Sequence, residues 1–62
     1  MTTQYKGLYI FVENDDDGKP FFEITNKNGE TIYSQPDSEA TRAQALQAGK
    51  EWIDANPTRR TP

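Results

Sequence analysis

The feature that most constrains the fold is a series of three β-prone runs separated by turn-forming segments. These runs, rich in β-branched and aromatic side chains, are residues 7–13, 21–26 and 30–34. Residues 14–20 combine three consecutive Asp with Gly18, which is typical of a turn. Asn28-Gly29 separates the second and third runs and predicts a type I′ hairpin turn. Three strands joined by short turns predict an antiparallel meander.

A single helix is expected after the strands. Residues 39–56 are rich in Ala and contain no Pro, and Asp37 or Ser38 can cap the first turn. Pro57 ends the helix, because the residue before a proline is disfavoured in the α region. The predicted fold is therefore α+β, with a three-stranded meander and one C-terminal helix packed on one face.

A chain of 62 residues has room for one domain. We expect residues 1–57 to form it and residues 58–62 to be a disordered tail with nothing to bury. Arg59 and Arg60 in this segment suggest either contact with an acidic partner or simple solubility.

Alternation along the strands assigns an aliphatic face that the helix must cover. Its members are Leu8, Ile10, Val12, Phe22, Ile24 and Ile32. The matching helix stripe consists of Ala45, Leu46, Gly49, Trp52 and Ile53. A glycine in the middle of that stripe predicts close approach of the helix backbone to a bulky sheet residue such as Phe22.

The other sheet face is unusually aromatic. Alternation gives it Tyr9, Phe11, Phe21 and Tyr33, with Glu13, Glu23 and two Thr between them. Partly covered rings in this number leave an apolar patch of the size that usually signifies contact. The alternative is that cross-strand aromatic pairs merely stabilise the sheet. The predicted interface residues are Tyr9, Phe11, Phe21, Glu23 and Tyr33.

Composition narrows the possible partners. The chain has no Cys and no His, which excludes disulfides, zinc fingers, thiol catalysis and histidine-dependent triads. Domains this small often gain stability by oligomerisation, so a homodimer is expected. The net charge of −3 argues against nucleic acid and anionic membranes as partners. The longest apolar run is Leu8 to Val12, which is too short for a membrane span or signal peptide, so a cytoplasmic location is expected.

Two segments resemble chemical sites, but a structural role explains each of them better than a chemical one. Residues 13–18 resemble the start of a calcium loop, but Ile24 occupies the position that requires a bidentate carboxylate, so a solvated acidic turn is favoured. Glu23 is the one plausible acid–base residue, and a domain of this size has little volume for a substrate pocket. No metal, cofactor or enzymatic activity is therefore predicted.

Residues 8–34 resemble the YegP-like family of small bacterial proteins. The resemblance rests on the run 9–18 with its Asp-Gly turn, the Phe22-Glu23-Ile24 strand and the Asn28-Gly29-Glu30-Thr31-Ile32 hairpin. The helix departs from the family pattern, since Pro36-Asp37-Ser38 stands where an aromatic residue is usual. The resemblance implies β-β-β-α units that pack in pairs, by tandem repeat or by dimerisation, and it implies no activity or cofactor.

Three functional classes are thus compared. The sequence favours a homodimeric interaction or accessory module that associates through the aromatic face. The alternative is a small acidic inhibitor or regulator that binds a heterologous protein. A sheet that reads DNA is disfavoured, because such a sheet should carry Lys and Arg, whereas this one carries Glu13 and Glu23.

Overall fold

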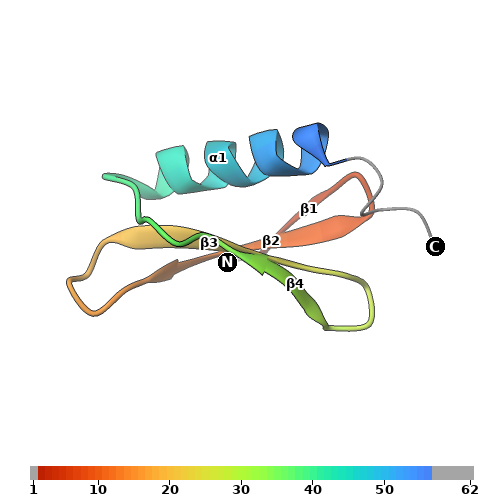
Figure 1. The fold of residues 1–62 in the computed structure, drawn as a ribbon, viewed down its shortest axis with the longest axis horizontal. Helices are drawn as coiled ribbons and strands as arrows, with labels where there is room; N and C mark the ends of the chain where they lie inside the picture. The colour runs from red at the N-terminus through yellow and green to blue at the C-terminus, as the bar shows by residue number, and fades with distance from the viewer. Residues whose placement is uncertain (1, 57–62) are drawn as a thin grey trace.

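A computed structural model describes residues 2–56 as one antiparallel sheet covered by one helix. The strands follow one another in the order β1-β2-β3-β4, and helix α1 lies across one face (Figure 1). The elements are β1 Thr2–Tyr5, β2 Leu8–Asn14, β3 Pro20–Thr25, β4 Thr31–Ser34 and α1 Arg42–Ala55. The α+β class is confirmed, but the sheet has four strands and not the predicted three. The predicted tail, residues 58–62, lies outside the described residues.

The additional strand, β1, pairs with β2 through a two-residue turn. Lys6 and Gly7 both have positive φ, 51° and 84°, which is the backbone of a type I′ hairpin. Gly7 is therefore a turn residue, although the sequence placed it in the first strand. In the sequence, the only signal for this turn is the glycine directly before β2. The short polar run of β1 does not show the alternation of apolar and polar residues that marks a half-buried strand.

The other two hairpins share one loop motif. Each loop, 15–19 and 26–30, begins with an Asp or Asn side chain that accepts hydrogen bonds from the N–H groups two and four residues later, at 2.9–3.0 Å. The fourth loop residue, Gly18 or Gly29, has a φ of 80° or 85° and donates to the first residue's carbonyl. This is a type I turn followed by a G1 bulge, so the type I′ prediction at Asn28-Gly29 is wrong.

Helix α1 begins later than the sequence predicted. Its N-cap is Thr41, whose hydroxyl oxygen accepts a hydrogen bond from the Gln44 N–H at 3.1 Å. The Gln44 side chain accepts one from the Thr41 N–H at 3.2 Å. This reciprocal pair is a capping box, and it supersedes Asp37 and Ser38 as predicted caps.

The residues before Thr41 tie the linker to the sheet instead of continuing the helix. Glu39 donates its N–H to the Pro20 carbonyl at 2.7 Å, and its carboxylate accepts from the Gln35 side chain at 2.7 Å. Glu39 thus lies in the linker, and the predicted helix of residues 39–56 shortens at both ends.

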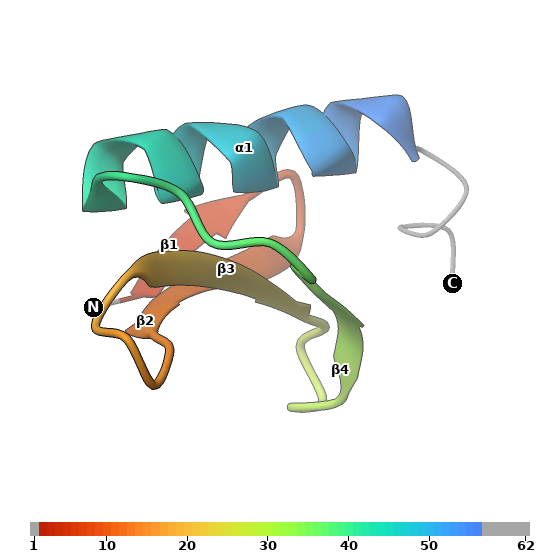
Figure 2. The same cartoon turned by 60° about the vertical axis from the view of Figure 1, so that its left-hand side comes forward.

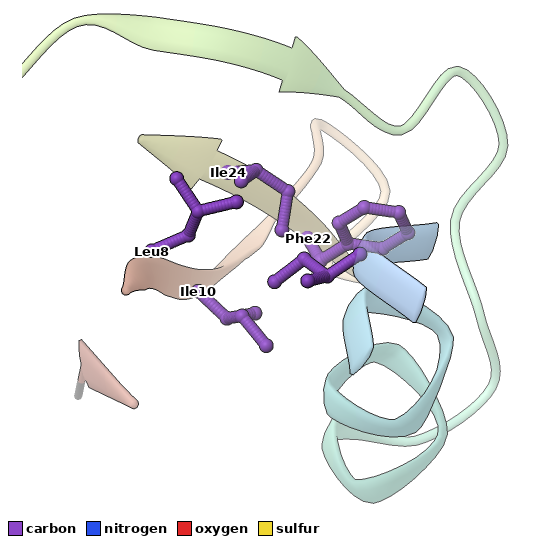
Figure 3. Close-up of a cluster of buried hydrophobic side chains, with 5 residues drawn as sticks. Leu8, Ile10, Phe22 and Ile24 are labelled. Atoms are coloured by element: carbon purple, nitrogen blue, oxygen red, sulfur yellow. The ribbon is translucent and has the colours of Figure 1, made fainter. Parts of the chain in front are cut away.

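The core lies between α1 and the two central strands. Figure 3 shows Leu8, Ile10, Phe22 and Ile24 projecting from β2 and β3 on the side that carries the helix. The buried apolar residues are Leu8, Ile10, Phe22, Ile24, Ala45 and Ile53. Leu46, Trp52 and Ile32 pack against this cluster and are partly exposed. The predicted aliphatic face and helix stripe are therefore confirmed.

Gly49 allows the helix backbone to approach the sheet closely. A Cβ built at this position would lie 2.8 Å from Ile10 Cγ2 and 3.4 Å from the Phe22 ring. The approach to Phe22 predicted from the sequence is confirmed, and Ile10 makes the closer contact. Because Ile10 is fully buried and branched at Cβ, its methyl has little freedom to move away.

We expect Gly49→Ala to destabilise the protein by about 1–2 kcal/mol, since overpacking outweighs the roughly 1 kcal/mol gain in helix propensity. Urea unfolding measures this change. In an Ile10→Ala background, where the contacting methyl is absent, the same substitution should become stabilising. A stabilising effect of Gly49→Ala in the parent chain would contradict the close contact.

Candidate interaction surface

The sheet face opposite the helix has no covering layer within residues 2–56. Figure 2 shows α1 above the sheet and none of the described elements below it. We call this surface the outer face. Its outward-facing residues, given by the strand register, are Thr2, Gln4, Tyr9, Phe11, Glu13, Phe21, Glu23, Thr25, Thr31 and Ser34. The rings of Tyr9, Phe11 and Phe21 are each partly exposed.

Aromatic and acidic side chains alternate on the half of the outer face that is nearest the β2–β3 loop. In the register of β2 and β3, Phe11 pairs with Glu23, and Glu13 pairs with Phe21. The four side chains therefore form a two-by-two block in which each carboxylate has a ring beside it on the other strand. The two carboxylates lie on one diagonal of the block and the two rings on the other.

Tyr33 does not belong to the outer face, which corrects the predicted interface. A register shift between Ile24 and Thr25 makes Ile32 an extra residue, so Tyr33 pairs with Ile24 and points toward the helix. Its ring stacks on Trp52 with centroids 4.6 Å apart and lies 5.7 Å from the Phe22 ring. Simple alternation along β4 could not reveal this, because a bulge reverses the alternation. Tyr9, Phe11, Phe21 and Glu23 do share the outer face.

Glu13 and Glu23 interact directly across the block. A hydrogen bond that the protonated Glu13 carboxyl donates to the Glu23 carboxylate raises the pKa of Glu13 above its usual value, and slight desolvation and the negative charge of Glu23 act in the same direction. Glu23 also accepts a hydrogen bond from the Ser34 hydroxyl at 2.9 Å. The outward-facing strand residues include no Lys or Arg, so no cation among them neutralises this pair.

A hollow of about 180 Å³ lies at the end of the outer face beside Phe21. Asp15, Gln35, Pro36 and Ser38 form its remaining walls. Asp15 is engaged in the loop, since its carboxylate accepts hydrogen bonds from the Asp17 and Lys19 N–H groups. The hollow is therefore a shallow extension of the outer face and does not present a free carboxylate for catalysis.

The described residues offer no second kind of site. Within residues 2–56, no group of three or more acidic side chains is placed to hold a metal ion. In the same part of the chain, no helix is long and apolar enough to cross a membrane. A second hollow, of about 150 Å³, lies between α1 and the β1–β2 hairpin and is lined by Thr3, Val12, Arg42, Ala43 and Leu46.

Comparison with family models, curated proteins and solved structures gives no match for this chain. Membership of the YegP-like family therefore stays a prediction, as do the pairing and the function that it implies.

Replacing Tyr33 and replacing Phe11 should have different effects on stability. Tyr33→Lys places an ammonium between Trp52 and Phe22, and we expect it to lower the free energy of unfolding by about 2 kcal/mol or more. Phe11→Lys changes an uncovered position, and we expect a loss of about 1 kcal/mol or less. Urea unfolding of the two variants at low protein concentration measures the contrast. Equal losses would contradict the assignment of the two rings to opposite faces.

Asp15 should make stability depend on pH in acid. Hydrogen bonds from the Lys19 backbone and the Ser38 side chain lower the pKa of Asp15 below its usual value. A carboxyl with a lowered pKa in the folded state contributes stability above its unfolded pKa, and loses it as the pH falls through the folded pKa. We therefore expect Asp15→Asn to flatten the acid side of the stability–pH profile. An unchanged profile would show that the loop does not favour the charged form.

Proposed function

We propose that the protein is a homodimeric interaction module in which the outer face binds the same face of a second copy. The observation that supports the proposal is a layer of partly exposed rings, Tyr9, Phe11 and Phe21, on a face that no described element covers. A second covering layer would bury these rings, and a closed two-fold dimer is the simplest arrangement that supplies one.

The alternating block suits pairing between identical faces. Consider two blocks stacked face to face about a two-fold axis that runs through their centre, parallel or perpendicular to the strands. Either axis places Phe11 of one copy opposite a glutamate of the other, and it places each Glu23 opposite a ring. Carboxylates then meet aromatic rings, whose edges are electropositive, and do not meet each other directly. The pattern is thus self-complementary under the symmetry that most homodimers use.

The size of the face fits a dimer of modest affinity. Four strands of four to seven residues, at about 3.4 Å per residue and about 4.8 Å apart, present a projected area of roughly 340 Å². Stable interfaces bury about 800 Å² of accessible surface per partner, and weaker ones bury less. The outer face is smaller than a standard interface, so we expect a dissociation constant in the micromolar range or weaker. No catalytic step is assigned to this surface.

Substitutions on the outer face test the proposal. Phe11→Lys and Phe21→Lys place ammonium groups where the partner's rings would pack, so both should raise the dissociation constant at least about tenfold. Gln47→Lys adds the same charge on the exposed side of α1 and should leave the dissociation constant unchanged. Sedimentation equilibrium or light scattering over a concentration series measures it, with circular dichroism confirming that each variant is folded.

A monomer at about 100 μM protein under every condition would contradict the proposal, since even a weak specific dimer would then be populated. That result would leave the alternative in which the outer face binds a heterologous protein. A dimer that all three substitutions affect equally would show that the second copy binds elsewhere.

A further inference from the structure

The Glu13–Glu23 pair lies within the proposed interface, and this location has a consequence for how the dimer forms. We propose that the outer face takes up protons at the Glu13–Glu23 pair when two copies associate, so that the dimer is favoured as the pH falls. This inference rests on the proposed function and identifies what regulates it. The proton is the ligand, and the acid pair is its site.

Association of two copies is coupled to proton uptake because it brings their carboxylates together. Each copy brings two carboxylates in diagonal positions on β2 and β3, so a face-to-face dimer encloses four. Although the alternating block keeps them from direct contact, all four lose water at once, and water is what stabilises their charged form. One shared proton per pair would convert each pair into a hydrogen-bonded carboxyl–carboxylate unit with one negative charge.

No outward-facing residue of the strands supplies a positive charge that could replace the proton. On the flanking strands, β1 contributes Thr2 and Gln4 to the outer face, and β4 contributes Thr31 and Ser34, none of which is charged. On the central strands, the remaining titratable side chain is Tyr9.

The β2–β3 loop, at the end of the outer face, carries the charged residues Asp15, Asp16, Asp17 and Lys19. Hydrogen bonds from the Lys19 N–H and the Ser38 side chain lower the pKa of the Asp15 carboxyl, and the positive charge of Lys19 adds a smaller effect in the same direction. Helix α1 lies on the other face of the sheet (Figure 1). Its Arg42 guanidinium reaches β2, where it donates to the Val12 carbonyl at 2.9 Å and to the Asn14 side chain at 3.4 Å.

The single chain is already poised for this response. The carboxyl of Glu13 has a raised pKa before any partner binds, because its protonated form donates a hydrogen bond to the Glu23 carboxylate, whose negative charge lies nearby. Association adds burial, which moves the pKa further in the same direction. A group whose pKa rises on binding promotes binding below its free pKa, and this contribution is lost as the pH rises through the bound-state pKa.

Proton uptake on association gives a measurable slope when the logarithm of the association constant is plotted against pH. Each acid pair that takes up one proton decreases the logarithm of the association constant by up to one for each unit of pH increase. The symmetric dimer contains two pairs. We therefore expect a slope between about −1 and −2 over the range between the free and the bound pKa, and a flat profile at higher pH.

Removal of one ionisable group from the pair tests the inference. Glu13→Gln keeps the size and the hydrogen-bonding capacity of the side chain and abolishes its charge. We expect it to strengthen dimerisation at neutral pH at least about tenfold and to remove most of the pH dependence. Glu51→Gln, the same change on the exposed side of α1, should behave like the parent chain. Sedimentation equilibrium from about pH 5 to about pH 8 measures all three proteins, with circular dichroism at each pH as the folding control.

The possible outcomes separate this inference from the proposal beneath it. Dimers of equal affinity at every pH, with Glu13→Gln indistinguishable from the parent, would overturn proton uptake and leave the homodimer intact. If parent and Glu13→Gln both stay monomeric at every pH while folded, the outer face does not self-associate and both statements fail. A pH-dependent dimer that is unaffected by Glu13→Gln but altered by Glu51→Gln would place the titrating group outside the outer face, which also overturns the inference.

Discussion

A single helix can shield only one face of a four-stranded sheet, and this limit governs the whole molecule. Helix α1 sits close to β2 and β3 because Gly49 has no side chain to hold it away from Ile10 and Phe22. That contact defines the core, which contains six buried apolar residues. It also commits the helix to one side of the sheet and leaves the rings of Tyr9, Phe11 and Phe21 on the other. The surface proposed as the interface therefore follows from where the core is built.

Period-two alternation predicted the central part of this structure, because β2 and β3 are regular and pair without interruption. The core side of Ile10 and Ile24 and the outer side of Phe11 and Phe21 follow directly from it. Alternation fails where the backbone departs from regularity. The bulge beside Ile24 turns Tyr33 toward Trp52, and no local sequence pattern marks that bulge.

The wrong predictions of where the helix and the turns begin have a related cause. Turns and caps depend on which backbone N–H and C=O groups are already hydrogen-bonded elsewhere. The sequence contains the Thr41 and Gln44 capping box, yet Asp37 and Ser38 are equally good caps when viewed alone. The linker settles the matter, because the Glu39 N–H is held by the β3 backbone and the chain cannot begin its helix there. The acid pair of the outer face likewise depends on the exact β2–β3 register, which one hairpin loop determines.

The central claim is that the outer face meets another copy of itself, and isotope-filtered NMR on an equimolar mixture of labelled and unlabelled chains tests it most directly. The account predicts intermolecular contacts between the rings of Phe11 and Phe21 in one copy and side chains of β2 and β3 in the other, with none from the exposed side of α1. Intermolecular contacts confined to the β1 edge or to the helix, or none at a concentration where the dimer is populated, would contradict it.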